Sequence, residues 1–288
     1  MYFHQRTIAE QVNCFGIGLH SGKPVHLTIK PAPVNNGIKF VRVDLPGKPE
    51  VQAHFSNVVD TSLATVIGKD GCIVSTVEHL MACFTGMSID NAVVEVDAYE
   101  LPITDGSAEP FVNMIYKAGI KKQHGTKVVL FINEQIELLD GDKSVIVYPA
   151  PSYKISCTIE YEHPIITKQT FLFDPSIHSF QKEIASARTF GFFHEVESMK
   201  RHGLARGGSL ENAVVLDNKS IMNNDGLRYS NEFVRHKILD CIGDFSLMGI
   251  PIIGHVVTVR SGHKFNHAFL EKLLAKKKFW ETRCLDVI

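Results

Sequence analysis

The chain follows one plan twice, and this repeat is the feature that most restricts its fold. Residues 23–30 alternate apolar and polar side chains, as a half-buried strand does, and lead into a Pro-Ala-Pro tripeptide. Residues 143–148 show the same alternation and the same tripeptide. A second predicted strand follows each of them, at 38–43 and at 155–159. This repeated order predicts a duplicated unit.

The second part of each half also follows a shared order. It is a predicted helix, then a Met-x-Ile tripeptide, then an apolar strand. In the first half the helix covers 76–85 and the strand 92–96. In the second half they cover 232–247 and 252–259. Helices and strands within each unit predict an α+β fold, with each similar domain built from a sheet and helices.

The join between the halves is predicted near residues 121–125, which gives domains of residues 1–124 and 125–288. Because the two helices correspond in the repeat, a site between the halves would bring their polar residues together. The first helix carries Glu78 and His79, and the second carries His236 and Asp240 four residues apart, on one face. Two histidines and one carboxylate are a common ligand set of catalytic zinc.

Each helix also has a purely structural interpretation. Ser75-Thr76-Val77-Glu78 fits a capping box, and Gly86 fits the glycine that follows a helix. In the second helix, Ser230 or Asn231 is the expected N-cap. His236, Asp240 and Asp244 lie opposite an apolar stripe, so this face either meets water or forms a covered polar lining. Helical periodicity alone does not decide between the two.

The bulk composition narrows the class of protein. The length of 288 residues suits two domains, and a hydrophobic fraction of 44% indicates a globular protein. The formal net charge of −1 argues against a broad nucleic-acid surface. The six cysteines lack CxxC spacing, the N-terminus has no apolar signal core, and no apolar run suits a membrane span. We therefore expect a cytoplasmic protein with no nucleic-acid partner and no membrane span.

Six short motifs follow one another along nearly the whole chain. They are residues 16–22 (GIGLHSG), 75–80 (STVEHL), 101–107 (LPITDGS), 187–192 (ARTFGF), 232–240 (EFVRHKILD) and 261–263 (SGH). Each is weak alone, but the ordered set closely resembles the zinc-dependent UDP-3-O-acyl-N-acetylglucosamine deacetylases of lipid A biosynthesis. The resemblance implies two similar domains packed as a β-α-α-β sandwich, with the helices between the sheets.

The resemblance also implies roles for individual residues. His79, His236 and Asp240 would hold Zn²⁺ as the cofactor, and Glu78 would be the general base. His263 would be the general acid or oxyanion partner, oriented by Asp244. Thr189 would contact the oxyanion, and Lys237 would lie near the carbonyl and the diphosphate. These roles describe hydrolysis of the N-acetyl amide to acetate and a free amine.

Substrate contacts are implied at further positions. Tyr161 and Phe190 fall where the family contacts the sugar nucleotide, and Arg260 joins Lys237 as a cation for the diphosphate. Phe192 and Phe193, with residues 214–216, are predicted to line an apolar groove for the acyl chain. Gly208 is predicted either to form a turn with Gly207 or to contact uracil through its backbone. Two positions depart from the family: Ala64 replaces a frequent Cys, and Tyr161 replaces a common Phe.

Two other functions remain open from the sequence. The chain could be a zinc hydrolase of another acylated sugar or of a peptide, or a non-enzymatic protein that binds sugar nucleotides. The leading interpretation expects a monomer whose partner is a small molecule, an acylated UDP-N-acetylglucosamine. Acyl-chain length is not readable from the sequence.

Overall fold

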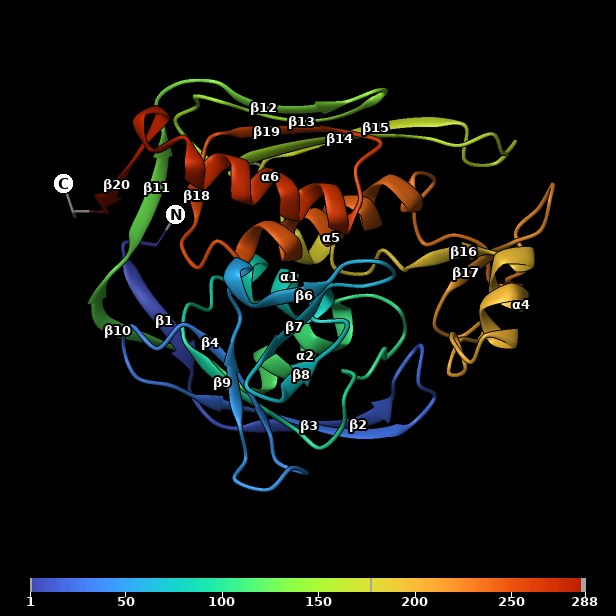
Figure 1. Cartoon of the computed structure of the whole chain (residues 1–288), viewed down its shortest axis with the longest axis horizontal. Helices are drawn as coiled ribbons and strands as arrows, with labels where there is room; N and C mark the ends of the chain where they lie inside the picture. The colour runs from blue at the N-terminus through green and yellow to red at the C-terminus, as the bar shows by residue number, and fades with distance from the viewer. Residues whose placement is uncertain (1, 177, 286–288) are drawn as a thin grey trace.

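Two five-stranded sheets form the outer layers of the protein, and helices fill the space between them (Figure 1). This arrangement comes from a computed structural model, which describes residues 2–176 and 178–285. The middle layers hold α1 (Glu78–Gly86), α2 (Glu109–Ala118), α5 (Glu232–Ser246) and α6 (His263–Ala275). The predicted β-α-α-β sandwich is therefore confirmed.

The two sheets have matching strand orders. The first runs β2-β3-β9-β4-β5 and the second runs β12-β13-β19-β14-β15. The first sheet consists of β2 (Val12–Ile17), β3 (Pro24–Pro31), β9 (Ala92–Val96), β4 (Ile38–Arg42) and β5 (Glu50–Gln52). The second consists of β12 (Ile136–Asp140), β13 (Lys143–Tyr148), β19 (His255–Val259), β14 (Lys154–Glu160) and β15 (Lys168–Phe173).

The central strand of each sheet has the same two neighbours. β9 pairs antiparallel with β3 and parallel with β4, just as β19 pairs antiparallel with β13 and parallel with β14. The strands predicted from the sequence fall on β3, β4 and β9 and on their counterparts β13, β14 and β19. The predicted strand 252–259 is divided, since β18 (Ile252–Ile253) joins a different sheet. The duplication is confirmed in its topology.

Alternating burial explains why each sheet covers the helices with one face. Val25, Leu27 and Ile29 of β3 are fully buried, as are Val145 and Val147 of β13, and the residues between them are more exposed. Side chains two apart on a strand point to the same face, so these residues form a continuous apolar surface toward the helix layer. The apolar period seen in the sequence thus sets the position of the core.

The Met-x-Ile tripeptides also have a common structure. Their middle residues, Ser88 and Gly249, both adopt a left-handed backbone, with φ of 55° and 78°. A left-handed residue turns the chain away from the end of a helix. In both halves this turn leads from the helix back toward the central strand of the sheet.

A glycine allows α1 and α5 to pack closely where they cross. A Cβ added to Gly243 of α5 would lie 2.1 Å from the carbonyl oxygen of Glu78, the first residue of α1. No larger residue fits against that backbone without moving a helix. This crossing brings together the polar residues of the two helices.

Two predictions about helix ends are wrong, and a third is right in position but not in its hydrogen bond. Glu78 does not form a capping box, because Thr76 is left-handed with φ of 60° and the Ser75 N–H donates to the Tyr99 carbonyl. Gly86 is the last residue of α1 and lies against the Phe180 ring, so close packing, not a positive φ, requires glycine there. Asn231 occupies the N-cap of α5, but its side chain accepts a hydrogen bond from the Arg235 guanidinium instead of the helix backbone.

Smaller elements surround the sandwich. β16 and β17 with α4 lie at the end of the molecule opposite the two termini (Figure 1). Their bounds and those of the remaining elements are β1 (His4–Ile8), β6 (Val58–Asp60), β7 (Val66–Lys69), β8 (Cys72–Val74), β10 (Ile120–Thr126), β11 (Val128–Ile132), β16 (Phe190–Phe192), β17 (Val214–Leu216), β20 (Trp280–Cys284), α3 (Phe180–Glu183), α4 (Phe193–Arg201), η1 (Phe55–Asn57) and η2 (Lys277–Phe279). The domain boundary at 124/125 stays a prediction, and β10 runs across it.

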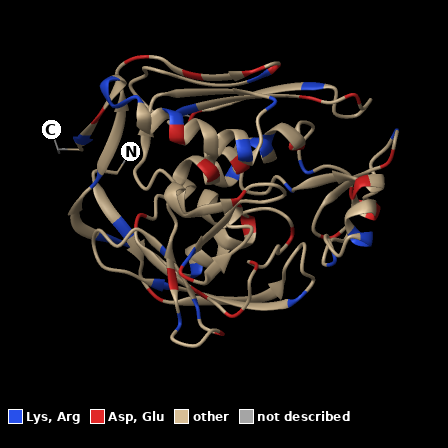
Figure 2. Cartoon of the chain, in the orientation of Figure 1, with Lys and Arg blue, Asp and Glu red and all other residues tan. Residues whose placement is uncertain are grey.

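Charged residues are found in the helix layer as well as on the outer loops (Figure 2). Glu78, Asp240 and Asp244 are each less than 5% exposed. A carboxylate at such depth is costly unless other groups compensate its charge. Within the described residues, no helix is both long enough and apolar enough to span a membrane.

Candidate active site

His79 of α1 and His236 and Asp240 of α5 converge where the two helices cross. One ligand atom from each lies within 4.8 Å of the other two, and all three residues are buried. Asp240 Oδ1 is 3.3 Å from His236 Nε2 and 3.7 Å from His79 Nε2. The predicted meeting of the two helices is confirmed. The solvent-facing alternative for this face of α5 is wrong, because α1 of the other half covers it.

The surroundings leave His236 and Asp240 in the forms that bind metal. His236 Nδ1 lies 3.0 Å from the Ala187 carbonyl, so it donates its proton there and leaves the Nε2 lone pair free. Burial lowers the pKa of His236 to about 3, which keeps the imidazole neutral. Burial by itself would raise the pKa of Asp240, but His236 and Lys237 hold that pKa well below its usual range.

The spacing fits a tetrahedral zinc ion. Ligand atoms about 2.1 Å from zinc at tetrahedral angles lie about 3.4 Å apart. The separations of 3.3 and 3.7 Å between Asp240 Oδ1 and the two histidine nitrogens bracket that value. The donor set of two imidazoles and one carboxylate also matches hydrolytic zinc sites, which keep one position open.

Glu78 lies beside this set as the first residue of α1. It is 3% exposed, and its Oε2 accepts a hydrogen bond of 3.0 Å from the Thr65 backbone N–H. Burial raises the pKa of Glu78, although His263 and His79 oppose the rise. The helix N-terminus favours the ionised form. The net direction is upward, which suits a carboxylate that must accept a proton near neutral pH.

His263 faces Glu78 from the start of α6. Its Nε2 is 3.9 Å from Glu78 Oε1, and its Nδ1 is 2.9 Å from Asp244 Oδ2. Burial alone would lower the pKa of His263, but the Asp244 and Glu78 carboxylates outweigh it and raise that pKa to about 10. The imidazole is therefore held protonated, with one N–H on Asp244 and the other directed toward the site.

Lys237 adds a cation at the edge of the same cluster. Its Nζ donates to Asp240 Oδ2 at 2.8 Å and lies 5.6 Å from the centre of the Phe190 ring. Burial would lower its pKa, but Asp240 outweighs burial and raises it. The ammonium is thus fixed on the oxygen of Asp240 that does not face the histidines.

Thr189 lies on the segment that leads into β16. Its N–H donates to the Gly106 carbonyl at 2.8 Å, and its carbonyl accepts from Val214 at 2.8 Å. Two residues earlier, Ala187 supplies the carbonyl that holds His236. Thr189 is therefore on a segment attached directly to the candidate metal set.

A buried ion pair fixes this segment to α5. Arg188 Nε is 2.9 Å from Glu232 Oε1, with the side chains 2% and 0% exposed. Glu232 precedes His236 by one helical turn, so the pair holds the Ala187 carbonyl in register with the imidazole. Leaving either charge without its partner would be costly at this depth.

Tyr161, Phe190 and Phe192 form an aromatic group next to the site. The Tyr161 ring lies 5.8 Å from Phe190 and 5.9 Å from Phe192, and Phe190 lies 6.4 Å from the His236 ring. The structure thus brings together three residues that were predicted separately as substrate contacts.

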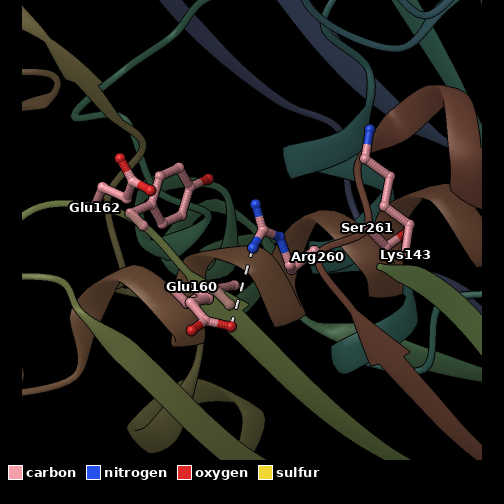
Figure 3. A pocket seen from close by; sticks show the side chains of 7 residues that line it. Lys143, Glu160, Glu162, Arg260 and Ser261 are labelled. Atoms are coloured by element: carbon pink, nitrogen blue, oxygen red, sulfur yellow. Dashed lines mark ion pairs between the residues drawn. The ribbon is translucent and has the colours of Figure 1, made fainter. Parts of the chain in front are cut away.

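A cavity of about 420 Å³ opens beside Tyr161 (Figure 3). Its lining consists of Lys143, Ile159, Glu160, Tyr161, Glu162, Arg260 and Ser261. Arg260 follows β19 and extends toward Glu160, with 4.0 Å between the charged groups, while Lys143 begins the neighbouring strand β13. Ser261 is two residues from His263, so the cavity adjoins the candidate active site.

Gly207 and Gly208 lie in a different loop. A Cβ on Gly207 would be 2.2 Å from the Gly18 carbonyl, so this glycine allows two loops to approach closely. The Gly208 N–H donates to the Ala205 carbonyl at 3.2 Å, which is the predicted turn. Gly208 is not one of the described residues that line the cavity near Tyr161.

Several residues of the site have no signal in the sequence. Thr65 and Asn266 both donate to Asp244, at 2.6 and 2.8 Å, yet neither lies at a diagnostic spacing from it. Lys143 lies at the start of a strand and reads as a solvated strand end. The Ala187 carbonyl belongs to the backbone, so no side chain could have indicated it.

Known proteins match this arrangement over nearly the whole chain. Residues 5–275 match the family described as "LpxC: UDP-3-O-acyl N-acetylglycosamine deacetylase". The chain belongs to this family. It is 50% identical over 279 residues to the UDP-3-O-acyl-N-acetylglucosamine deacetylase of Myxococcus xanthus (strain DK1622), covering 97% of this chain and 89% of the relative.

Two further relatives carry the same name. The protein of Syntrophus aciditrophicus (strain SB) is 46% identical over 282 residues, covering 98% of this chain and 89% of the relative. The protein of Teredinibacter turnerae (strain ATCC 39867 / T7901) is 46% identical over 284 residues, covering 98% of this chain and 94% of the relative. The resemblance drawn from the ordered motifs is confirmed.

Proposed function

We propose that this protein is a zinc-dependent deacetylase that hydrolyses the N-acetyl amide of UDP-3-O-acyl-N-acetylglucosamine. The products are acetate and the free amine, in the committed step of lipid A biosynthesis. One observation carries the proposal: a buried His-His-Asp set at zinc spacing lies beside Glu78 and His263, whose facing atoms are 3.9 Å apart. Family membership supplies the substrate, as the names of the relatives describe it.

His79, His236 and Asp240 would hold the zinc ion. When bound, Zn²⁺ polarises a carbonyl and makes water more acidic. Glu78 accepts the proton of the attacking water, because its carboxylate is buried and its pKa is raised. Oε2 is occupied by the Thr65 N–H, which leaves Oε1 to take the proton.

His263 donates a proton, whereas Glu78 accepts one. Asp244 holds the imidazole protonated, so Nε2–H can stabilise the oxyanion or protonate the leaving amine. Thr189 contributes a hydroxyl from the segment next to the metal set, where one oxyanion donor is worth about 3 kcal/mol. Lys237 adds positive charge near the carbonyl and the diphosphate.

The two ends of the substrate need different surroundings. Arg260, Lys237 and Lys143 provide cations at or near the cavity for the diphosphate, with Tyr161 and Phe190 against the sugar nucleotide. Phe192 and Phe193, which are partly exposed, provide apolar surface for the acyl chain, at about 0.8 kcal/mol per buried CH₂. Residues 214–216, also predicted for this groove, are buried in β17 and pair with β16, so they support this surface instead of lining it. A backbone contact from Gly208 to uracil also belongs to the proposal. We further propose a cytoplasmic monomer, with domains of residues 1–124 and 125–288.

The test combines metal content with product release. The purified protein should contain about one zinc per chain and should release acetate from the acylated UDP-N-acetylglucosamine. The same acylated sugar without UDP should turn over far more slowly. Equal rates with and without the nucleotide would favour a zinc hydrolase of broader substrates. Tight nucleotide binding without acetate release under any divalent ion would favour a binding protein.

A further inference from the structure

Thr65 contacts both carboxylates that flank the reacting position. Its backbone N–H donates to Glu78 Oε2 at 3.0 Å, and its hydroxyl donates to Asp244 Oδ1 at 2.6 Å. The residue is 2% exposed, so water does not compete for these bonds. One residue thus contacts the proposed proton acceptor and the carboxylate that holds the proposed proton donor. Its hydroxyl oxygen also lies 3.4 Å from Nδ1 of that donor, His263.

The backbone of Thr65 is fixed to the first half of the molecule. Its carbonyl accepts from the N–H of Val77, the residue that precedes α1, at 3.3 Å. Together with the bond to Glu78, this attaches Thr65 to the start of α1. Its hydroxyl then crosses to α5 of the second half, where Asp244 lies 179 residues further along the chain.

The remaining partners of Asp244 lie mainly on its other oxygen. Asn266, itself 1% exposed, donates to Oδ2 at 2.8 Å, and His263 Nδ1 lies 2.9 Å from the same oxygen. His263 Nδ1 is also 3.2 Å from Oδ1, where the Thr65 hydroxyl, at 2.6 Å, is the closer partner. Because both oxygens are held, the carboxylate is fixed in one orientation, and that orientation sets the plane of the His263 ring.

We propose that Thr65 is a positioning residue, whose hydroxyl fixes the Asp244–His263 pair relative to Glu78. The expected fall in kcat rests on the proposed function, whereas the expected effect on the geometry of the Asp244–His263 pair does not. The hydroxyl contacts neither the candidate metal ligands nor the cavity lining within the described residues. Loss of the hydroxyl should therefore affect the chemical step and leave substrate and metal binding intact.

The test replaces Thr65 by Val, which has nearly the same shape and keeps the backbone bond to Glu78. In the zinc-loaded enzyme, kcat should fall about tenfold to a hundredfold, as expected for one lost hydrogen bond to a charged group. KM and zinc content should stay within about twofold. Thr65→Ser should restore most of kcat, because it restores the hydroxyl. Thr65→Ala removes the same hydroxyl without added bulk, and it decides the question if the Val variant does not fold.

The matched control is Thr7→Val. Thr7 is also buried, at 3% exposure, and its hydroxyl accepts from the Ala32 N–H at 3.0 Å on the distant strand β1. The control loses one buried hydrogen bond, as the test variant does, but kcat should not change. An equal fall of kcat in both variants, or a loss of zinc in Thr65→Val alone, would overturn the positioning role.

A second readout does not depend on turnover. The Nδ1–H proton of His263 should give a downfield NMR resonance because it is bonded to a buried carboxylate, and His263→Gln identifies that resonance. Thr65→Val should shift or broaden it, whereas Thr7→Val should leave it in place. An unchanged resonance in Thr65→Val contradicts the proposal. If the wild-type protein releases no acetate, the proposed function fails, and the resonance still decides whether Thr65 positions the pair.

Discussion

Gly243→Ala tests whether the close crossing of α1 and α5 builds the site. The added Cβ would lie 2.1 Å from the Glu78 carbonyl oxygen and 2.8 Å from its carbon, where real contacts are longer than 3.0 Å. The obstacle is helix backbone, which cannot rotate away as a side chain can. The helices must therefore separate locally by about 1 Å, since close-packed interiors have no space to absorb the methyl group.

This separation should affect function more than stability. Overpacking costs about 1–3 kcal/mol, but alanine in place of glycine within a helix returns about 1 kcal/mol. The net loss of unfolding free energy should therefore be about 0–2 kcal/mol. The candidate metal ligands come from both helices, His79 from α1 and His236 and Asp240 from α5. Separating the helices would therefore move His79 away from the other two ligands. A misplacement of about 1 Å costs about a hundredfold in rate.

The assay measures zinc affinity, acetate release and urea unfolding for the same preparations. Gly262→Ala is the control, because a Cβ there meets no atom within 4 Å although the residue adjoins His263. We expect the Gly243 variant to fold, to bind zinc more weakly and to lose about a hundredfold in turnover. The control should stay within about twofold. Wild-type zinc affinity and turnover in Gly243→Ala would refute the dependence of the site on this contact.

Three further predictions follow from the site. Glu78→Gln should keep zinc and lose most turnover, because it removes the proton acceptor and no proposed ligand; near-normal turnover would exclude the base role. His236→Ala should lose zinc itself, measurable as metal content after dialysis, and full occupancy would exclude that ligand. Asp244→Asn should lower the pKa of His263 from about 10, moving the alkaline limb of activity to lower pH; an unmoved limb would contradict the assignment.

The Asp244 variant also makes a stability prediction whose sign can be worked out. The folded-state pKa of His263 is raised to about 10, above its ordinary value of 6.5. The stabilisation is therefore fully present below pH 6.5 and is lost as the pH rises through 10. In metal-free protein, Asp244→Asn should be most destabilised relative to wild type below pH 6.5, with the gap narrowing at higher pH. Urea unfolding across this range measures it, and a gap that widens with pH would contradict it.

Helix α5 shows most clearly what can and cannot be predicted from the sequence. Helical spacing predicts a helix over 232–247, and the structure has one at Glu232–Ser246. The same spacing puts His236, Asp240 and Asp244 on one face but leaves open what covers it. The covering group is α1, brought there because both helices occupy equivalent positions in a duplicated unit. Only the crossing at Gly243 shows that this face is buried.

At Glu78, by contrast, the local sequence pattern gave a wrong prediction. Its neighbours match a capping box, a local pattern that is usually reliable at a helix start. The carboxylate turns instead to the Thr65 N–H, thirteen residues earlier in the chain. A capping-box pattern takes account only of hydrogen-bond partners near in sequence. A partner from a distant part of the chain that binds the same carboxylate prevents the capping bond from forming.

The sequence by itself determined the duplicated α+β plan, the positions of its main strands and helices, and the residue types that could hold zinc. These depend on apolar period and residue chemistry, which are written locally along the chain. The tertiary structure decided which face of each helix is covered, which carboxylate holds His263, and that Thr65 and Asn266 support it. Those outcomes depend on contacts between distant residues, and such contacts exist only after the two halves have packed.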